Sequence, residues 1–319
     1  MPSRVRVFAP ATVANLGPGF DVLGLALERP GDLLEAELTS RPGVEIVQIT
    51  GDDGALSTDP DRNVAGRAAA DVLRRVRVQA RDRGDGQGLR LWLHKQMPLA
   101  SGLGSSGASS VAGAVAANEL LGRSLAKEEL LLCAMEGERI ASGSAHADNV
   151  APSLLGGIVL IRSYEPLEIV SLPVPSSLWI AVAHPHCELS TAAARAVVND
   201  HPYSIGDAVR NLGNMGAFVA ALHAGDLQLL GRCIEDALVE PLRAPLIPGF
   251  AKVKAAALAA GALGCSIAGA GPSIFAFCAD EPSANRSGAA MCGTFRAAAQ
   301  LDCDLFVGRV SRTGARVVA

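Results

Sequence analysis

The stretch of sequence that decides the fold is Pro98-Leu99-Ala100-Ser101-Gly102-Leu103-Gly104-Ser105-Ser106-Gly107-Ala108. It follows an alternating apolar segment, residues 89–93, which predicts a strand, and it precedes small residues with helical character. Glycines let a backbone approach an anion closely, and the first N–H groups of a helix are unpaired at the positive end of its dipole. Ser105 and Ser106 are expected to cap that helix and to present hydroxyls. The stretch therefore predicts a cradle for a triphosphate.

Two other kinds of phosphate-binding loop, the Walker A loop and the Rossmann dinucleotide loop, fit the same stretch less well. A Walker A loop requires a lysine after its second glycine, and no lysine stands in or just after this segment, which excludes it. The spacing Gly102-x-Gly104-x-x-Gly107 satisfies the dinucleotide fingerprint, but a Rossmann unit also needs a second strand that ends in an acidic residue roughly 20 residues on. Glu119 instead falls within a helical stretch. From the local pattern alone, a helix start rich in glycine and serine without any ligand stays open.

Length and composition set the class of protein. The chain has 319 residues, 49% of them hydrophobic, which suits two domains with sizeable cores. Its 28 basic and 32 acidic residues give a net charge of −4, which does not suit a protein that binds nucleic acid or a membrane surface. No apolar run reaches the ~18 residues of a spanning helix, no signal peptide is evident, and seven scattered cysteines suit a reducing compartment. We expect a cytoplasmic protein.

The pattern of apolar residues predicts a mixture of strands and helices without a strict βαβ repeat, hence an α+β fold. Pro10 is expected to end the first strand, and residues 141–152 are expected to form a polar loop. Strands are expected at 5–9, 22–28, 33–38, 44–49, 89–93, 178–183, 266–268, 274–277 and 305–310, and helices at 65–76, 108–121, 125–140, 191–199, 205–223, 227–239, 250–260 and 287–299. A change of composition at 163–175 predicts two domains, residues 1–165 and 166–319.

Three segments, in order, resemble the motifs of the GHMP kinases: residues 10–21, 98–108 and 265–273. Gly107 departs from the alanine usual in the second motif. The resemblance runs almost end to end. It implies ATP as the phosphate donor, an N-terminal ribosomal-protein-like α/β domain that binds ATP, and a C-terminal ferredoxin-like α+β domain. It assigns every residue of the 98–108 stretch to ATP, together with Asn63, for which an adenine contact and a plain helix cap are equally good interpretations.

Further segments resemble the branch of the family that phosphorylates the side-chain hydroxyl of L-homoserine, giving O-phospho-L-homoserine for threonine biosynthesis. These segments are residues 15–21, 144–152, 190–195, 241–243 and 246–249. The resemblance implies substrate contacts at Asn15, Asp21, His146, Asp148, Asn149, Thr191, Arg195 and Arg243.

The chemistry of homoserine suits four of these residues. Arg195 and Arg243 could hold its carboxylate, which a planar guanidinium fits well. Asp21 and Asp148 could receive its ammonium group. A lone arginine on a helix is ordinarily a solvated surface charge, but here each charged residue lies inside a family segment.

The resemblance also implies Mg²⁺, which takes oxygen ligands and usually only one or two from protein. Ser106 and Glu138 match the metal positions of the family. Glu136 is the rival, and spacing from His146 favours Glu138; both glutamates could instead be solvated helix charges. Because no lysine is close in sequence to Asn15 or Asp148, we expect catalysis without a dedicated side-chain base. The third motif is expected to buttress the first, although a purely structural turn explains its glycines nearly as well.

Functions of other classes leave weaker traces. An RNA-binding interpretation would use six arginines, but Asp71, Asp82 and Asp85 interleave with them and no aromatic residue stands among them for stacking. A zinc interpretation would use His184 and His186, for which no fourth ligand is near. A mevalonate-like alcohol is the alternative kinase substrate, and a homodimer is conceivable. The six arginines are Arg74, Arg75, Arg77, Arg81, Arg83 and Arg90.

Overall fold

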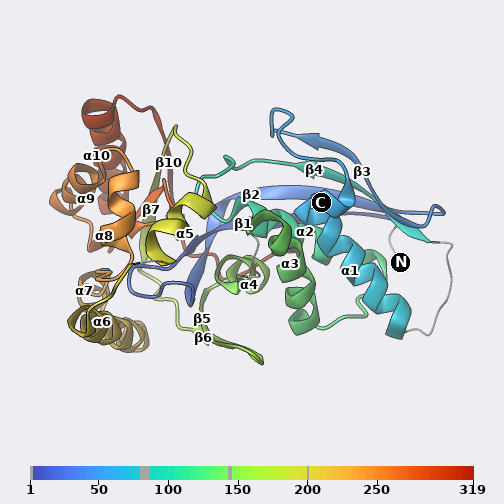
Figure 1. Ribbon diagram of the computed structural model, residues 1–319, viewed down its shortest axis with the longest axis horizontal. Helices are drawn as coiled ribbons and strands as arrows, with labels where there is room; N and C mark the ends of the chain where they lie inside the picture. Colours follow the sequence, from blue (N-terminus) through green and yellow to red (C-terminus); the bar gives the residue numbers. More distant parts are fainter. Residues whose placement is uncertain (1–2, 80–86, 143–145, 200) are drawn as a thin grey trace.

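The computed structural model describes residues 3–79, 87–142, 146–199 and 201–319. The expected loop at 79–88 lies mostly outside these residues. Two β-sheets organise the described chain. Figure 1 shows the helices of the first half gathered at one end of the molecule and those of the second half at the other, with strand β2 running between them. Among the described residues, no helix has the length and apolar character needed to cross a bilayer.

The larger sheet belongs mainly to the first half of the chain. Its strand order is β11-β1-β2-β4-β3, with β5 paired to β2 and β6 paired to β5. Only the β3–β4 pair is parallel. The strands are β1 (Arg4–Ala14), β2 (Leu23–Thr39), β3 (Gly43–Thr50), β4 (Gly88–His94), β5 (Ile158–Tyr164), β6 (Leu167–Leu172) and β11 (Arg316–Val317).

Four helices accompany this sheet: α1 (Val64–Gln79), α2 (Ser105–Leu120), α3 (Lys127–Ser142) and α4 (Ala147–Leu155). Helix α2 is buried along almost its whole length because its small residues allow neighbours to approach closely. A Cβ atom on Gly113 would lie 2.3 Å from the carbonyl oxygen of Ala65, at the crossing with α1. A run of alanine, glycine and serine therefore makes α2 the central helix. The predicted phosphate-binding stretch at residues 98–108, called the phosphate loop below, leads directly into it.

The smaller sheet has the order β10-β7-β9-β8 and is antiparallel throughout. Its apolar core includes Phe250, Met291 and Phe295, which α9 and α10 contribute. The strands are β7 (Trp179–Pro185), β8 (Gly264–Ile267), β9 (Ile274–Cys278) and β10 (Cys303–Arg309). The helices are α5 (Thr191–Asn199), α6 (Ile205–Ala224), α7 (Leu227–Arg232), α8 (Glu240–Arg243), α9 (Phe250–Ala259) and α10 (Glu281–Ala299). Two short 3₁₀ helices lie at Pro60–Arg62 and Ala244–Leu246.

The first two strands are longer than the sequence predicts. Pro10 does not end β1, because the pairing with β2 shifts register between Pro10 and Thr12. A proline without an N–H is tolerated at such a bulge. For the same reason β2 is one strand rather than the two predicted segments, with Pro30 and Gly31 inside it.

One loop prediction and one helix prediction are also wrong. Residues 147–155 form α4 instead of a polar loop, because Val150, Ala151 and Leu154 bury an apolar face that outweighs the cost of Pro152. The helix predicted at 227–239 ends at Arg232. Beyond it, the Asp236 carboxylate accepts the N–H groups of residues 238, 239 and 240 and holds a turn.

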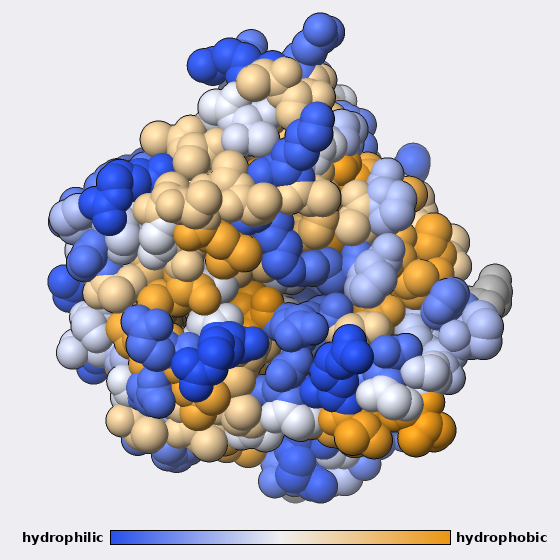
Figure 2. Space-filling model, turned by 90° about the vertical axis from the view of Figure 1, so that its left-hand side faces the viewer, coloured by the Kyte–Doolittle hydropathy of each residue, from blue (hydrophilic) through white to orange (hydrophobic). Residues whose placement is uncertain are grey.

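Helix α6 carries a narrow apolar stripe on its outer face. Ile205, Val209 and Leu212 are 81%, 63% and 72% exposed and recur at helical spacing. Figure 2 shows the end of the molecule that the second half of the chain forms, where hydrophobic and hydrophilic residues are interspersed. The expected homodimer stays a prediction.

Candidate functional site

The phosphate loop ends in a helix start without a side-chain cap. Gly104 is the N-cap of α2, in the left-handed region with φ 64°, and no side chain bonds the first-turn N–H groups. The predicted capping by Ser105 and Ser106 is therefore wrong, because both already lie within the helix. Ser105 Oγ is buried and has no hydrogen-bond partner among the described residues. Uncapped N–H groups and an unpartnered hydroxyl suit an anion at this helix start.

Two glycines let the loop fit between neighbouring segments. Gly102 has φ 78°, and a Cβ atom there would lie 2.4 Å from the carbonyl oxygen of Ala268. A Cβ atom on Gly104 would lie 2.0 Å from Thr12 Oγ1. No other residue fits either position without displacing the first or the third motif.

The three motifs are joined by hydrogen bonds. The N–H of Thr12 donates to the carbonyl of Leu103 at 3.0 Å, and Ser273 Oγ donates to the carbonyl of Ser101 at 2.6 Å. Asn15 Nδ2 donates to the carbonyl of Gly269 at 2.8 Å. The third motif thus contacts both the first motif and the phosphate loop, which is the buttress that the sequence predicted.

Lys95 is a site residue that sequence reasoning missed. Its Nζ is buried, pairs with Asp32, and donates to Ser105 O at 3.0 Å and to Ser109 Oγ at 2.8 Å. Burial lowers the pKa of Lys95, and the Asp32 charge opposes that shift. The hydrogen bonds from Lys95 to Ser105 and Ser109 therefore hold the first turn of α2 in place. Its position three residues before the loop was the only signal, and its partner Asp32 is distant in sequence.

Glu138 comes from α3 and faces the loop. Ser106 Oγ donates to Glu138 Oε2 at 3.1 Å. Burial raises the pKa of Glu138 to about 7. Glu136 points elsewhere, to Arg67 at 2.8 Å and Arg139 at 3.3 Å. A hydroxyl and a carboxylate oxygen together, beside a phosphate cradle, are oxygen donors that suit Mg²⁺.

The other end of the site is built around an ion pair. Arg195 on α5 donates from both Nη atoms to Asp21, at 2.8 and 2.9 Å. The same bonds raise the pKa of Arg195. Arg243 is 3% exposed and donates to the carbonyls of Ala194 and Gly269 at 3.0 and 3.1 Å. Each guanidinium keeps donors for a further acceptor, because each has five N–H groups.

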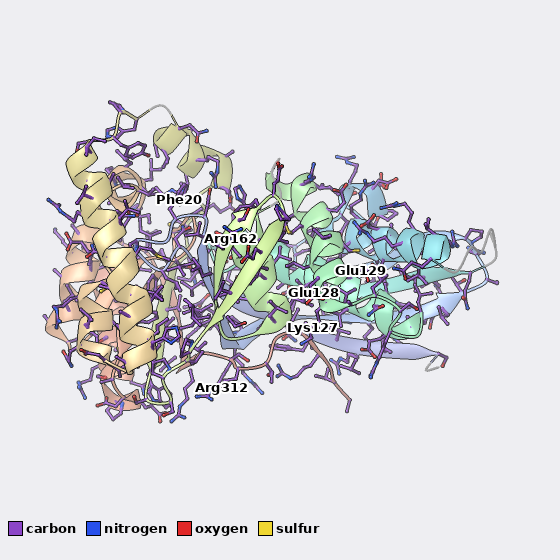
Figure 3. All side chains as sticks on the ribbon, turned by 90° about the horizontal axis from the view of Figure 1, so that it is seen from below. Phe20, Lys127, Glu128, Glu129, Arg162 and Arg312 are labelled. Atoms are coloured by element: carbon purple, nitrogen blue, oxygen red, sulfur yellow. The ribbon has the colours of Figure 1, made fainter. Side chains whose placement is uncertain are left out.

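Phe20 joins the two arginines and was not among the predicted contacts. The Cζ atoms of Arg195 and Arg243 lie 5.2 and 5.0 Å from the centre of its ring. The ring face attracts each guanidinium, so Phe20 helps to hold both arginines at this end of the site. Figure 3 labels Phe20 in the half of the molecule that the later helices form, beside its boundary with the first half. The family segment at 15–21 contained this residue, but its role depends on arginines from two distant helices.

Three polar residues at the start of α4 complete this end. Burial, followed by the charge of Asp21, raises the pKa of Asp148 to about 7. Asn149 Oδ1 accepts a hydrogen bond from Thr12 Oγ1 at 2.7 Å. His146 Nδ1 lies 3.9 Å from Asp21 Oδ2, and burial lowers the pKa of this histidine. The segment that the sequence predicted to be a loop thus places its polar residues on the first turn of a helix.

One cavity of about 520 Å³ connects both ends. Most predicted residues line it, including Asn15, Asp21, Asn63, Leu99, Ala100, Ser101, Gly102, Gly104, Ser105, Ser106, Glu138, His146, Asp148, Asn149, Thr191, Arg195 and Arg243. Four of the predicted residues are not in the lining: Pro98 is half-buried, and Leu103, Gly107 and Ala108 are buried behind it. Leu56, Arg62, Lys95, Ser109, Ile140, Ser190, Gly269 and Ala270 are lining residues that were not predicted.

Asn63 acts as a helix cap in the structure. Its Oδ1 accepts the N–H groups of Ala65 and Gly66 at 3.0 and 3.3 Å, and its Nδ2 donates to Ser57 O. The side chain also lines the cavity.

The residues of the alternative interpretations have other partners. Arg74 and Arg75 bind Asp71, and Arg90 lies 3.0 Å from Glu37, so these charges are neutralised locally. Arg81 and Arg83 lie outside the described residues. His184 Nδ1 is 3.0 Å from Ser273 Oγ, where it supports the third motif.

Comparisons with known proteins agree with this geometry. The family model described as GHMP kinases N terminal domain matches residues 63–157, and the GHMP kinases C terminal model matches residues 218–297. A homoserine kinase of Chlorobium phaeovibrioides is 48% identical over 98% of this chain and 99% of its own. A homoserine kinase of Arabidopsis thaliana is 44% identical over 98% of this chain and 84% of its own.

Solved structures extend the likeness. The crystal structure of homoserine kinase from Cytophaga hutchinsonii is 48% identical, has a TM-score of 0.93, and is matched over 100% of this chain and 98% of its own. L. major mevalonate kinase, at 18% identity and a TM-score of 0.74 over 97% of this chain and 98% of its own, shares the fold. The two-domain α+β fold expected from the sequence is confirmed. The chain therefore belongs to the GHMP kinase family, and within it to the homoserine kinases.

Proposed function

We propose that this protein transfers the γ-phosphate of ATP to the side-chain hydroxyl of L-homoserine, giving O-phospho-L-homoserine for threonine biosynthesis. The observation that carries the proposal is the single cavity in which an uncapped helix start and a clamp of paired charges lie together. The first suits a triphosphate, and the second suits a zwitterion.

The charge clamp has the composition that a zwitterion needs. An amino acid brings one carboxylate and one ammonium group, and Arg195 and Asp21 already hold each other in the same bidentate geometry. Homoserine would exchange that pair for two pairs, with its carboxylate on Arg195 and Arg243 and its ammonium on Asp21 and Asp148. Because the ammonium favours the charged carboxylate, homoserine binding should lower the pKa of Asp148 from about 7.

Phosphoryl transfer is mainly positioning and charge neutralisation. We propose that residues 98–108 hold the phosphates and that Ser106 and Glu138 hold Mg²⁺, which would neutralise charge on the transferred group. The homoserine hydroxyl oxygen forms a bond to the γ-phosphorus as the bond to the β–γ bridging oxygen breaks, and ADP leaves. The hydroxyl proton passes to phosphate or solvent, because Lys95 is bound to Asp32 and Asp148 serves the ammonium.

The reaction is tested by ADP release with Mg·ATP and each of L-homoserine, mevalonate, galactose and L-serine. Turnover with homoserine alone is expected, because only it combines both charges with a hydroxyl at the right reach. Turnover with another alcohol would support the kinase activity but contradict the assignment of the paired charges to an amino-acid substrate. The absence of a catalytic base is tested separately: Asp148→Asn should weaken homoserine binding, and loss of turnover with binding intact would make Asp148 the base.

The division into residues 1–165 and 166–319 stays a proposal. Strands β6 and β11 fall in the second range but pair with the larger sheet. The chain therefore crosses between the sheets at 173–178 and returns at 310–315.

A further inference from the structure

A second cavity, of about 690 Å³, lies where the chain crosses between the two sheets. Its walls come from β2, from the outgoing crossing at 173–178, from the returning crossing at 310–315, and from the ends of β10 and β11 that flank the returning crossing. Figure 3 labels Arg312 at one edge of the molecule, well away from Phe20 of the kinase site. No residue lines both cavities.

The lining of this cavity is strongly basic. It includes Arg29, Arg309, Arg312 and Arg316, against one acidic residue, Glu28, so four positive charges and one negative charge leave a surplus of three. Within the described part of the chain, no carboxylate forms an ion pair with any of the four guanidinium groups. The surplus occurs in a protein whose net charge is −4. Like charges around one cavity repel each other, and an anion bound between them would offset that repulsion.

Three of the four arginines are held in place. The Cζ atom of Arg309 lies 4.9 Å from the centre of the Trp179 ring, and that of Arg316 lies 4.7 Å from the Phe8 ring. Arg312 Nη2 donates to the carbonyl of Val174 at 3.1 Å, which ties one crossing to the other. These contacts use a ring face or a single N–H and leave most guanidinium donors for another acceptor.

We propose that this cavity binds a small phosphorylated compound, through a phosphate ester or pyrophosphate group on the arginines. Planar guanidinium forks match phosphate oxygens in pairs, and three surplus charges match the charge of a pyrophosphate group near neutral pH. Val174, Leu178 and Val310 give an apolar wall for a short carbon skeleton. The bound compound contacts both segments that connect the two sheets, residues 173–178 and 310–315, and so links the sheets to each other.

The protein carries its own probe for the test. It has two tryptophans, Trp92 and Trp179, and a Trp92→Phe variant leaves Trp179 as the single reporter under Arg309. Sodium pyrophosphate, titrated at constant ionic strength, is expected to change Trp179 fluorescence with saturation and to raise the melting temperature. Arg312→Gln in this background is expected to weaken binding about tenfold or more. Arg296→Gln, an exposed arginine outside the cavity, is the matched control and should bind as the parent does.

Binding at the kinase site is separated by a Ser106→Ala variant, which should leave the Trp179 titration unchanged. Arg29→Gln repeats the test at an exposed residue should Arg312→Gln fold poorly. The proposal is overturned by a fluorescence change that sodium chloride reproduces at equal ionic strength. It is equally overturned by an affinity that neither arginine variant alters, or by no saturable change at millimolar pyrophosphate.

Discussion

The two ends of the proposed kinase cavity, one assigned to phosphate and the other to the amino acid, are built in opposite ways. The phosphate end is almost one continuous segment, residues 98–108, with Glu138 facing it. The amino-acid end takes Asp21, Asp148, Arg195 and Arg243 from four separate parts of the chain. The first end presents backbone donors of a helix start, which need only local sequence. The second presents paired side-chain charges, which need the whole fold. Variants should therefore affect the two substrates separately.

The largest effect is expected from Glu138→Gln at the phosphate end. Loss of the carboxylate that we assign to Mg²⁺ should lower kcat by about 10³-fold, about 4 kcal/mol, with little change in homoserine affinity. The measurement is steady-state kinetics against Mg²⁺ and each substrate. Glu136→Gln, two residues away but bound to Arg67 and Arg139, is the control and should retain activity. Equal losses of kcat in Glu138→Gln and Glu136→Gln would contradict the assignment of Glu138 to Mg²⁺.

At the amino-acid end, Arg195→Gln is expected to raise KM for homoserine by about 10²-fold, about 3 kcal/mol, because the substrate carboxylate loses its charge-assisted pair with Arg195. KM for ATP should stay near its parent value. Arg210→Gln, an exposed arginine on α6 outside the kinase cavity, controls for net charge. A change in KM for ATP of the same size would show that the two ends are not separate.

A fall in pH should weaken Mg²⁺ binding at one end through Glu138 and homoserine binding at the other end through Asp148. Glu138 and Asp148 both have a pKa raised to about 7, so both carboxylates become neutral as the pH falls through that value. The apparent affinity for Mg²⁺ should fall about tenfold from pH 8 to pH 6. The apparent affinity for homoserine should fall in the same range. Glu138→Gln should abolish the pH dependence of the apparent Mg²⁺ affinity and retain the pH dependence of the homoserine affinity. If Glu138→Gln abolished both pH dependences, a single shared titration would explain them.

Phe20→Leu should have a modest effect confined to the amino-acid end. It removes the ring that both arginines contact while it keeps an apolar side chain. KM for homoserine should rise about threefold, as expected for cation–π contacts of about 0.5–1 kcal/mol. No change in KM would mean that the ring serves packing alone.

The smallest functional effect is expected at Asn63, where the cap bonds occupy the side chain. Asn63→Ala should lower the free energy of unfolding by about 1 kcal/mol, measured by urea denaturation. KM for ATP should change little. A marked rise in KM for ATP at unchanged stability would favour the adenine contact instead.

Sequence patterns correctly predicted the helices α5, α6 and α9 and the two-domain α+β class, and they supplied the phosphate loop that we propose. They were wrong where a tertiary contact replaced a local rule. Pro10 stays inside β1 because the bulge needs no N–H, and 147–155 is helical because its apolar face is buried. The family segments assigned the charged residues at the amino-acid end. They contained Phe20 but assigned it no role, because its two contacts come from distant helices.

By itself, the sequence determined the chemistry that we propose for the phosphate end, because glycines and small residues at a helix start act through backbone groups that lie next to each other in the chain. Only the tertiary structure decided which charges face each other. It paired Arg195 with Asp21, placed Lys95 beside Asp32 under the loop, and gathered four arginines around the second cavity. Side-chain charges act over a few ångströms of space regardless of their separation in sequence, so their partners follow from folding and not from spacing.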